Sequence, residues 1–312
     1  MRQLRDSVLS EVRKVVVGQD AVVDSMLVAL SVRGHVLLEG PPGTAKTLLA
    51  NAVAHALGLT FRRAQFTPDL LPTDLTGTMT LIGGALGELS FRAGPVFTNV
   101  LLADEINRTP PKTQAALLEA MGESQVTVDG TTRALPNPFF VVATQNPIEY
   151  EGTYPLPEAQ LDRFTVKVNV DAPSKEDETA MLRLRHDGVR PATLEDVRAV
   201  CDAGQLMALR AEVDAVMVAD PILSYVVDIV RATRTLPAIA LGGSPRAAVQ
   251  LLATAKAHAS LEGRTFVTPD DVAAMARPVL RHRLVLRPEA EMERYRPDDL
   301  VAAALQSVTV PR

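Results

Sequence analysis

Strand-like apolar runs alternate with stretches of helical apolar spacing through the first half of the chain. The runs are residues 35–39, 61–66, 100–105, 139–144 and 164–170. Continuous apolar runs of this length are typical of strands buried on both faces of a parallel sheet. The stretches between them, such as residues 22–30, repeat apolar residues at helical spacing. The pattern therefore predicts an α/β fold in which helices flank a parallel core sheet of five strands.

Two further segments carry the pattern of β-hairpins. Residues 76–97 contain two short strand-like runs on either side of Gly83-Gly84, and residues 124–135 contain two more on either side of Asp129-Gly130. An Asp-Gly pair suits the tight turn that joins right-twisted antiparallel strands. We therefore predict that both segments are hairpins inserted into the α/β domain.

The second half of the chain is predicted to be helical. The run Asp171-Ala172-Pro173-Ser174 breaks the strand pattern, and apolar residues then recur at helical spacing over residues 175–186, 206–216 and 222–230. We predict an α/β domain over residues 1–172 and a smaller all-α domain over residues 173–312.

Some helix faces and helix starts can be predicted residue by residue. The expected buried face of the helix over residues 222–230 consists of Ile222, Leu223, Val226, Val227 and Val230. A capping residue followed by proline predicts a helix start, and such pairs occur at Thr109-Pro110, Ser244-Pro245 and Thr268-Pro269.

Composition supports a globular protein. The 312 residues are 47% apolar, and the net charge of −5 comes from interspersed signs with no basic stripe, which disfavours nucleic acid as the main partner. No stretch approaches about 18 uninterrupted apolar residues, so neither a membrane span nor a signal peptide is predicted. Cys201 is the single cysteine and is expected to be a small core residue in a reducing compartment, which favours a cytoplasmic protein.

A glycine-rich loop over residues 40–47 is the strongest functional signal in the chain. It follows one apolar run and precedes a helical pattern. Such a loop directs backbone N–H groups and a helix N-terminus at one point, where they bind an anion such as phosphate. Lys46 would reach the outer phosphates, and the Thr47 hydroxyl would hold Mg²⁺. Ala45 stands where the strict pattern has glycine, and the alternative interpretation is a glycine turn at a strand end.

Polar residues follow two later strands of the predicted sheet. Asp104 and Glu105 end the run 100–105, and Asn146 follows the run 139–144. The carboxyl ends of parallel strands form the ligand-binding edge of an open α/β sheet. Beside a phosphate loop, Asp104 would support the Mg²⁺ and Glu105 would polarise an attacking water. Asn146 would contact the γ-phosphate or that water. The alternatives are solvated acids at a strand end and a turn-forming asparagine before proline.

Arg246 lies just inside the helix predicted to begin at Ser244-Pro245. A cation in the first turn opposes the helix dipole, so its position suggests that it binds an anion. A solvated arginine is the alternative interpretation.

The order and spacing of these segments resemble those of AAA+ ATPases, and of their MoxR family in particular. The matching segments are Val17-Gly18-Gln19, residues 40–47, Leu102–Glu105, Asn146, Leu161-Asp162-Arg163-Phe164 and Gly243-Ser244-Pro245-Arg246. The match extends over nearly the whole chain, and alanine at position 45 is a form that this family commonly uses. The resemblance implies an AAA+ P-loop NTPase fold in which the helical domain is a lid on the nucleotide.

The resemblance also implies roles for individual residues. They are the adenine pocket for Val17 and Gly18, Walker A for Gly40, Pro41, Pro42, Gly43, Thr44, Ala45, Lys46, Thr47 and Leu48, Walker B for Asp104 and Glu105, sensor 1 for Asn146, and sensor 2 for Arg246. Arg163 would be the arginine finger, which reaches the γ-phosphate held by the neighbouring subunit. The catalytic residues would then be Lys46, Glu105, Asn146 and Arg163, with Thr47 and Asp104 as the Mg²⁺ ligands. The hairpins would be the helix-2 insert and the hairpin before sensor 1, which magnesium chelatase motor subunits share.

By resemblance, the protein would be an ATPase that hydrolyses Mg-ATP in a homo-oligomeric ring, with six subunits expected. An arginine supplied to phosphoryl transfer is worth on the order of 10³ to 10⁵ in rate, so an isolated monomer would turn over slowly. The biological role would be chaperone-like remodelling or maturation of partner proteins, together with a partner that carries a von Willebrand factor A domain. The sequence names no client protein.

Three other functions fit parts of the pattern. A magnesium chelatase motor subunit has the same fold and would need two further dedicated subunits encoded nearby. A nucleic-acid translocase has related hairpins, but the hairpin over residues 125–133 has one arginine and no lysine, which is a poor surface for tracking phosphates. An ATP-gated scaffold would bind a partner without turnover, and a measured turnover rate separates it from an ATPase.

Overall fold

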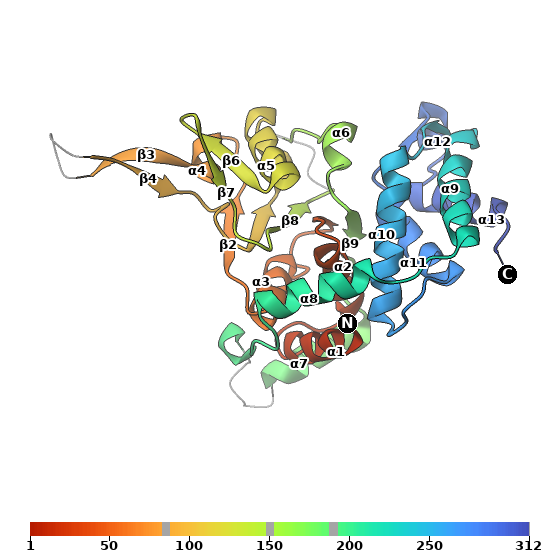
Figure 1. Ribbon diagram of the computed structural model, residues 1–312, viewed down its shortest axis with the longest axis horizontal. Coiled ribbons are helices and arrows are strands. Elements are labelled where there is room, and N and C mark those ends of the chain that lie inside the picture. The colour runs from red at the N-terminus through yellow and green to blue at the C-terminus, as the bar shows by residue number, and fades with distance from the viewer. Residues whose placement is uncertain (83–87, 148–152, 187–192, 312) are drawn as a thin grey trace.

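A five-stranded parallel sheet forms the centre of the molecule (Figure 1). The structure is a computed structural model that describes residues 1–82, 88–147, 153–186 and 193–311. The strand order is β2-β5-β8-β1-β9, and every pairing in this sheet is parallel. The strands are β1 Val36–Glu39, β2 Phe61–Gln65, β5 Val100–Asp104, β8 Phe140–Gln145 and β9 Val166–Asn169. The predicted five-stranded parallel sheet is confirmed.

The sheet is buried on both faces, as its continuous apolar runs predicted. Leu37 and Leu38 of β1 are both fully buried, and because successive side chains point to opposite faces they belong to two different apolar clusters. The helices α1 Arg2–Val12, α2 Asp20–Ser31 and α3 Lys46–Ala56 contribute to the first cluster, and α5 Pro111–Glu123 contributes to the second.

Helix α1 is an element that the apolar pattern did not predict. Charged and apolar residues follow one another closely in this segment, which hides the helical spacing. Val8, Leu9 and Val12 nevertheless share one face of the helix, and all three are buried in the first cluster.

Both predicted hairpins are present. They consist of β3 Gly77–Ile82 with β4 Glu88–Ala93, and of β6 Gln125–Val128 with β7 Thr131–Ala134. Asp129 and Gly130 have φ values of 48° and 75°, as a tight turn between right-twisted strands requires. Gly83-Gly84 lies outside the described residues. The β3–β4 hairpin projects away from the sheet (Figure 1), and the Arg133 guanidinium of the second hairpin lies 3.9 Å from the ring centroid of Phe91 in the first.

The predicted N-cap of α5 is wrong. The helix begins at Pro111 with Pro110 as its N-cap, and the Thr109 hydroxyl instead donates a hydrogen bond of 3.1 Å to the Thr67 carbonyl. The helical region is disfavoured for a residue before proline, so Pro111 favours an extended Pro110 and delays the helix by one residue.

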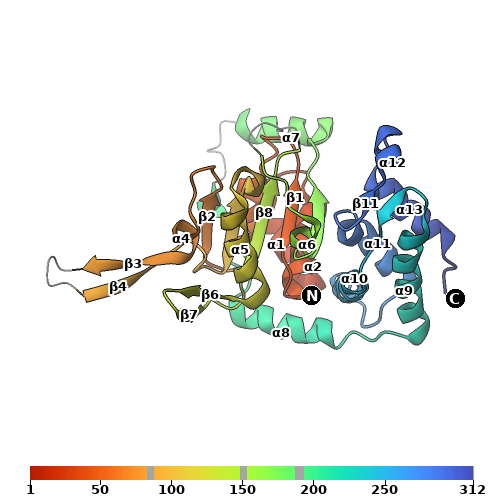
Figure 2. The ribbon, with the colours of Figure 1, turned by 90° about the horizontal axis from the view of Figure 1, so that it is seen from above.

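The second half of the described chain is mainly helical. Its elements are the helices α6 Glu158–Leu161, α7 Lys175–His186, α8 Ala203–Asp214, α9 Asp220–Thr235, α10 Pro245–Leu261, α11 Pro269–Leu280, α12 Pro288–Met292 and α13 Pro297–Ser307, the 3-10 turn η3 Leu194–Asp196, and the short antiparallel strands β10 Ile239–Leu241 and β11 Val285–Leu286. The first half also contains α4 Pro72–Thr76 and the 3-10 turn η2 Ile106–Arg108. Helices α9 to α13 form a lid at the end of the molecule opposite the β3–β4 hairpin (Figure 2). As predicted, Ser244 and Thr268 cap α10 and α11.

The predicted buried face of α9 is partly wrong. Leu223 and Val227 are 40% and 47% exposed, whereas Tyr225 and Ile229 are buried. Apolar residues continue around this helix, so spacing alone does not choose its inner face. Packing against α10 and α13 determines which face of α9 is buried.

The segment before α8 packs on the α/β part of the chain. The Val200 N–H donates a hydrogen bond of 2.8 Å to the Ala56 carbonyl, and the Cys201 thiol lies 3.6 Å from the Leu57 carbonyl. The domain boundary after residue 172 stays a prediction. Across the described ranges, no helix is both long and apolar enough to cross a membrane.

Candidate nucleotide-binding site

A cavity of about 400 Å³ lies at the carboxyl ends of β1, β5 and β8. Three adjacent strands end here, so the side chains that follow them converge from separate parts of the sequence. The residues that line the cavity are Pro42, Gly43, Thr44, Ala45, Lys46, Thr47, Leu48, Asp104, Glu105, Thr144, Gln145 and Asn146.

The loop between β1 and α3 forms one wall of the cavity. A side chain at Gly40 would place its Cβ atom 2.2 Å from the Val170 carbonyl oxygen, so only glycine fits at this position. Gly43 and Ala45 have positive φ values of 84° and 59°. Ala45 therefore adopts a left-handed conformation that glycine adopts without strain. Helix α3 begins immediately afterwards, which directs its N-terminus at the cavity.

Lys46 lies across this loop. Its ammonium donates hydrogen bonds of 2.7 Å to the Pro41 carbonyl, 2.9 Å to the Gly40 carbonyl and 3.2 Å to the Thr44 hydroxyl. Burial lowers the pKa of Lys46, and the carboxylates of Asp104 and Glu105 oppose this shift. The charge is thus held at the mouth of the loop, where an outer phosphate would bind.

Asp104 is the most densely bonded side chain of the site. Its Oδ1 accepts a hydrogen bond of 2.5 Å from the Thr144 hydroxyl. Its Oδ2 accepts bonds of 3.0 and 2.7 Å from Nε and Nη2 of Arg63, and one of 3.3 Å from the Thr47 hydroxyl. Asp104 is buried, with its side chain 11% exposed, so these bonds hold the carboxylate in one orientation.

Glu105 follows Asp104 in a left-handed conformation with φ of 56°. Its N–H donates a hydrogen bond of 2.9 Å to Thr144 Oγ1. Its Oε2 accepts a bond of 2.9 Å from the Gln65 amide and lies 3.1 Å from Nε of Arg108. The reversed backbone turns the Glu105 carboxylate away from the buried strand and toward the cavity.

The oxygens of Thr47 and Asp104 fit a magnesium ion. Mg²⁺ prefers hard oxygen ligands and takes one or two of them from protein beside substrate phosphates and water. The Thr47 hydroxyl and Asp104 Oδ2 are 3.3 Å apart and both face the cavity. In the described part of the chain no group of three or more His, Cys, Asp or Glu residues could hold a metal by itself, so the phosphates would have to supply the remaining ligands.

The structure brings some predicted site residues together and leaves others apart. Asn146 lines the cavity and is 7% exposed. Gly18 lies beside Asp177 of α7, and neither Val17 nor Gly18 lines this cavity. The predicted loop residues Gly40 and Pro41 do not line it either, and nor do Arg163 and Arg246.

Both arginines have partners elsewhere. Nη1 of Arg163 donates a hydrogen bond of 2.6 Å to the Leu118 carbonyl of α5. Nε of Arg246 lies 4.0 Å from Asp162 Oδ2, and the Arg246 side chain is 60% exposed.

Three residues of the site were not predicted from the sequence: Arg63 and Gln65 on β2, and Thr144 on β8. Thr144 ends an apolar run, and the order of the strands along the sheet is needed to see that it faces Asp104. Arg63 and Gln65 are two residues apart on β2 and therefore point to the same face of the sheet. Strand β2 pairs with β5 in a register that sets Gln65 opposite Asp104.

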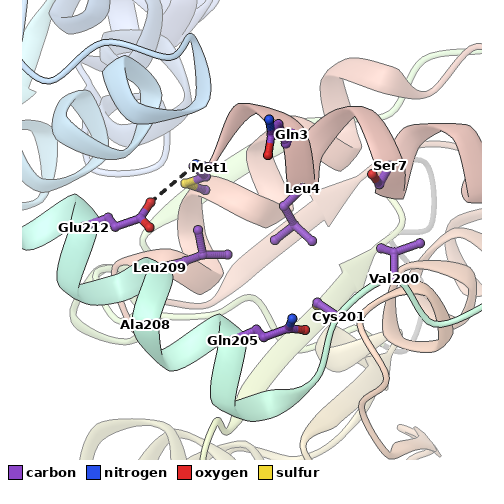
Figure 3. A pocket seen from close by; sticks show the side chains of 10 residues that line it. All are labelled: Met1, Gln3, Leu4, Ser7, Val200, Cys201, Gln205, Ala208, Leu209 and Glu212. Carbon is purple, nitrogen blue, oxygen red and sulfur yellow. Dashed lines mark ion pairs between the residues drawn. The ribbon is translucent and has the colours of Figure 1, made fainter.

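A second cavity of about 470 Å³ lies between α1 and α8, away from this site (Figure 3). Leu4 of α1 and Leu209 of α8 point into it, and the Met1 amino group forms an ion pair of 3.5 Å with Glu212. Cys201 borders the cavity, and burial raises the pKa of its thiol to about 11. The thiol therefore stays protonated at neutral pH, as expected of a structural cysteine.

Comparisons with known proteins agree with this geometry. The family described as "ATPase family associated with various cellular activities (AAA)" matches residues 35–166, and the AAA lid domain matches residues 231–304. The chaperone MoxR1 of Mycobacterium tuberculosis is 45% identical over 97% of this chain and 81% of its own length. The uncharacterised protein YeaC of Bacillus subtilis is 46% identical over 100% of this chain and 96% of its own length.

The protein MoxR of Methylorubrum extorquens is 33% identical over 96% of this chain and 93% of its own length. The crystal structure of a predicted ATPase from Cytophaga hutchinsonii superposes with a TM-score of 0.90 at 41% identity, covering 100% of this chain and 96% of that one. With the phosphate loop, the paired acids and the lid all in place, the chain belongs to the MoxR family of AAA+ ATPases.

Proposed function

We propose that this protein hydrolyses ATP to ADP and phosphate in the cavity at the ends of β1, β5 and β8. The observation that carries the proposal is the convergence on one cavity of loop residues 42–47, the acids Asp104 and Glu105, and Asn146. Membership of an ATPase family supports the same activity.

The loop and Lys46 would bind the triphosphate. Backbone N–H groups at the start of α3 point toward the cavity and need no side-chain charge to bind phosphate oxygens. Lys46 would exchange the Gly40 and Pro41 carbonyls for the outer phosphates. Thr47 and Asp104 would hold Mg²⁺, which when bound offsets the charge of the outer phosphates.

Glu105 would activate the attacking water. Its carboxylate lies at the cavity wall and accepts a hydrogen bond from Gln65, which orients it to accept a proton from water. Asn146, at the end of β8, would donate a hydrogen bond to the γ-phosphate or to the same water.

The substitution Glu105→Gln tests this assignment. We expect unchanged affinity for ATP, measured by calorimetry, and loss of phosphate release. Glu119→Gln, which removes a carboxylate on the exposed face of α5, is the matched control and should retain turnover. Undiminished hydrolysis in Glu105→Gln would remove Glu105 from the catalytic role.

We further propose that the active form is a homo-oligomeric ring, with six subunits expected. Arg163 would then complete the site of a neighbouring subunit, and Arg246 would contact the γ-phosphate in its own. The position of Arg163 outside its own cavity supports a role at another subunit's site. Arg246 is exposed and only loosely paired, so it is free to move toward a phosphate.

The proposed biological task is chaperone-like remodelling or maturation of partner proteins in the cytoplasm, where ATP is supplied. The name of the relative MoxR1, a chaperone, supports this task. A protein with a von Willebrand factor A domain is the proposed partner. Nucleic acid is not, because the arginine of the β6–β7 hairpin is stacked on Phe91 and so is engaged within the protein.

A further inference from the structure

The segment 162–165, which carries Arg163, is held by two buried residues of the lid. Nε of Arg283 donates a hydrogen bond of 2.7 Å to Asp162 Oδ1, and Nη2 donates one of 2.6 Å to the Phe164 carbonyl. Nη1 donates a third, of 3.3 Å, to the Thr165 carbonyl. The Phe164 carbonyl also accepts a bond of 3.0 Å from Nε2 of His282.

Arg283 also forms hydrogen bonds within the lid. The same guanidinium donates to the Val279 carbonyl of α11 and to the Gln250 side chain of α10. Its side chain is 3% exposed. Burial lowers the pKa of Arg283 to about 10, and Asp162 opposes this shift, so the group is charged at neutral pH. A charged fork with this many bonds has one orientation relative to both of its neighbours.

Asp162 lies between Arg283 and Arg246, the other arginine that was predicted to contact the nucleotide. Arg283 occupies Oδ1, while Arg246 of α10 approaches Oδ2 at 4.0 Å. The side chain of Arg163, one residue further on, turns toward α5. The lid therefore contacts the residues on both sides of Arg163 without contacting the cavity that holds Lys46 and Glu105.

We propose that Arg283 is a positioning residue that makes Arg163 follow the orientation of the lid. Rotation of the lid in one subunit would then move the arginine that this subunit offers to its neighbour. The inference rests on the proposed function, because it takes Arg163 to act at a neighbouring site. Arg283 would thus be the residue that couples the lid position of one subunit to the ATP site of the neighbouring subunit.

The test is complementation in mixed rings of full-length subunits. Arg283→Gln should bind fluorescent ATP within about twofold of the wild-type Kd, because Arg283 does not touch the cavity. Its turnover should fall about ten- to a hundredfold, the scale of a misplaced catalytic group. Mixing it with Glu105→Gln should raise turnover severalfold above the sum of the separate rates, because each subunit supplies what the other lacks.

Arg281→Gln is the matched control. Arg281 lies two residues away, and its ion pair of 2.9 Å with Asp298 stays within the lid. Its loss should leave turnover close to wild type. Thermal unfolding followed by circular dichroism reports whether each variant folds. If Arg283→Gln does not fold, Arg283→Lys keeps the buried charge but not the fork, and it should show the same loss and the same recovery on mixing.

The control mixture of Arg163→Ala with Glu105→Gln distinguishes failure of the shared ATP site from failure of the positioning role of Arg283. Affinity-tagged subunits establish that mixed rings form. Recovery in this control but not with the Arg283 variant overturns the positioning role alone. Absence of recovery in both mixtures overturns the shared site on which that role rests. Wild-type turnover in Arg283→Gln also overturns the inference.

Discussion

The Thr144 hydroxyl donates a hydrogen bond of 2.5 Å to Asp104 Oδ1. Thr144 is 1% exposed, and its oxygen also accepts the N–H of Glu105 at 2.9 Å. One hydroxyl on β8 therefore fixes both acids at the end of β5. Arg63 and Gln65 bond the same acids from β2, so the two strands that flank β5 together orient them.

The isosteric change Thr144→Val should therefore impair catalysis more than binding. It leaves Asp104 Oδ1 and the Glu105 N–H without their partner, which costs about 1–3 kcal/mol for each buried group. We expect kcat to fall about tenfold or more with little change in the affinity for ATP, measured by phosphate release and calorimetry. Thr144→Ser keeps the hydroxyl and should retain most activity. A fully active Thr144→Val would show that this hydrogen bond does not position the acids.

Arg63 should compete with Mg²⁺ for Asp104. Its guanidinium donates two hydrogen bonds to Oδ2, the oxygen that also accepts the Thr47 hydroxyl. The Arg63 side chain is 50% exposed, so the ion pair is worth less than about 1 kcal/mol. Arg63→Gln should lower the Mg²⁺ concentration for half-maximal binding of fluorescent ATP by about two- to fivefold.

The neighbouring residue supplies a control for this change. Arg62 points to the other face of β2, where it borders a different cavity with Asp74 and Arg92. Arg62→Gln removes the same charge without touching Asp104, so it should leave the Mg²⁺ dependence unchanged. Equal shifts in both variants would point to net charge as the cause. A weaker Mg²⁺ response in Arg63→Gln would mean that Arg63 helps to build the metal site.

Ala45→Gly should stabilise the fold. Ala45 has φ of 59°, a left-handed conformation that costs an L-residue about 1–2 kcal/mol. Glycine removes this strain but adds entropy to the unfolded chain, so the expected net gain is up to about 1 kcal/mol in the free energy of unfolding. Urea unfolding measures it. Ala208→Gly, at an exposed position inside α8, should lose about 1 kcal/mol, and a loss of similar size at position 45 would contradict the strain.

His35 should make stability fall in mild acid. It is buried, with Nε2 donating to the Met121 carbonyl at 3.1 Å and Nδ1 accepting the Val141 N–H at 3.0 Å, so a second proton has no place. Burial lowers the pKa of His35 to about 4, compared with 6.5 in the unfolded chain. The unfolded state binds more protons between these values. The contribution of neutral His35 to the free energy of unfolding is therefore fully present above pH 6.5 and is lost as the pH falls toward 4.

The expected loss from His35 alone is about 2 kcal/mol between pH 7 and pH 5. Urea unfolding at the two pH values should show a smaller loss in His35→Gln, because glutamine does not titrate. His55→Gln, in the last turn of α3, should keep the wild-type difference. The same pH dependence in all three proteins would contradict the assignment to His35.

The sequence predicted the elements whose signal is local. The five strands, both hairpins, and the starts of α10 and α11 follow from continuous runs, an Asp-Gly turn and capping residues. The site residues that carry a motif, such as Lys46 and Asp104, were predicted for the same reason. Their convergence follows from the rule that parallel strands end at one edge.

Features that depend on neighbours in space were missed or misplaced. Thr144 acts through the adjacency of β5 and β8, which no spacing in the sequence reveals. The inner face of α9 depends on α10 and α13, so Leu223 was wrongly placed inside. Arg283 contacts a segment more than a hundred residues earlier in the chain, and as one of two arginines just after α11 it carries no motif.

One apolar cluster continues from the sheet into the lid. Val166 and Val168 of β9 share it with Val272 and Val279 of α11. Neither part can keep these side chains out of water once the other unfolds, so calorimetry should record the sheet and the lid melting in a single step. A hinge motion that separated the lid from the sheet would expose this apolar contact to water. A rotation of the lid that keeps α11 in contact with β9 would avoid this exposure.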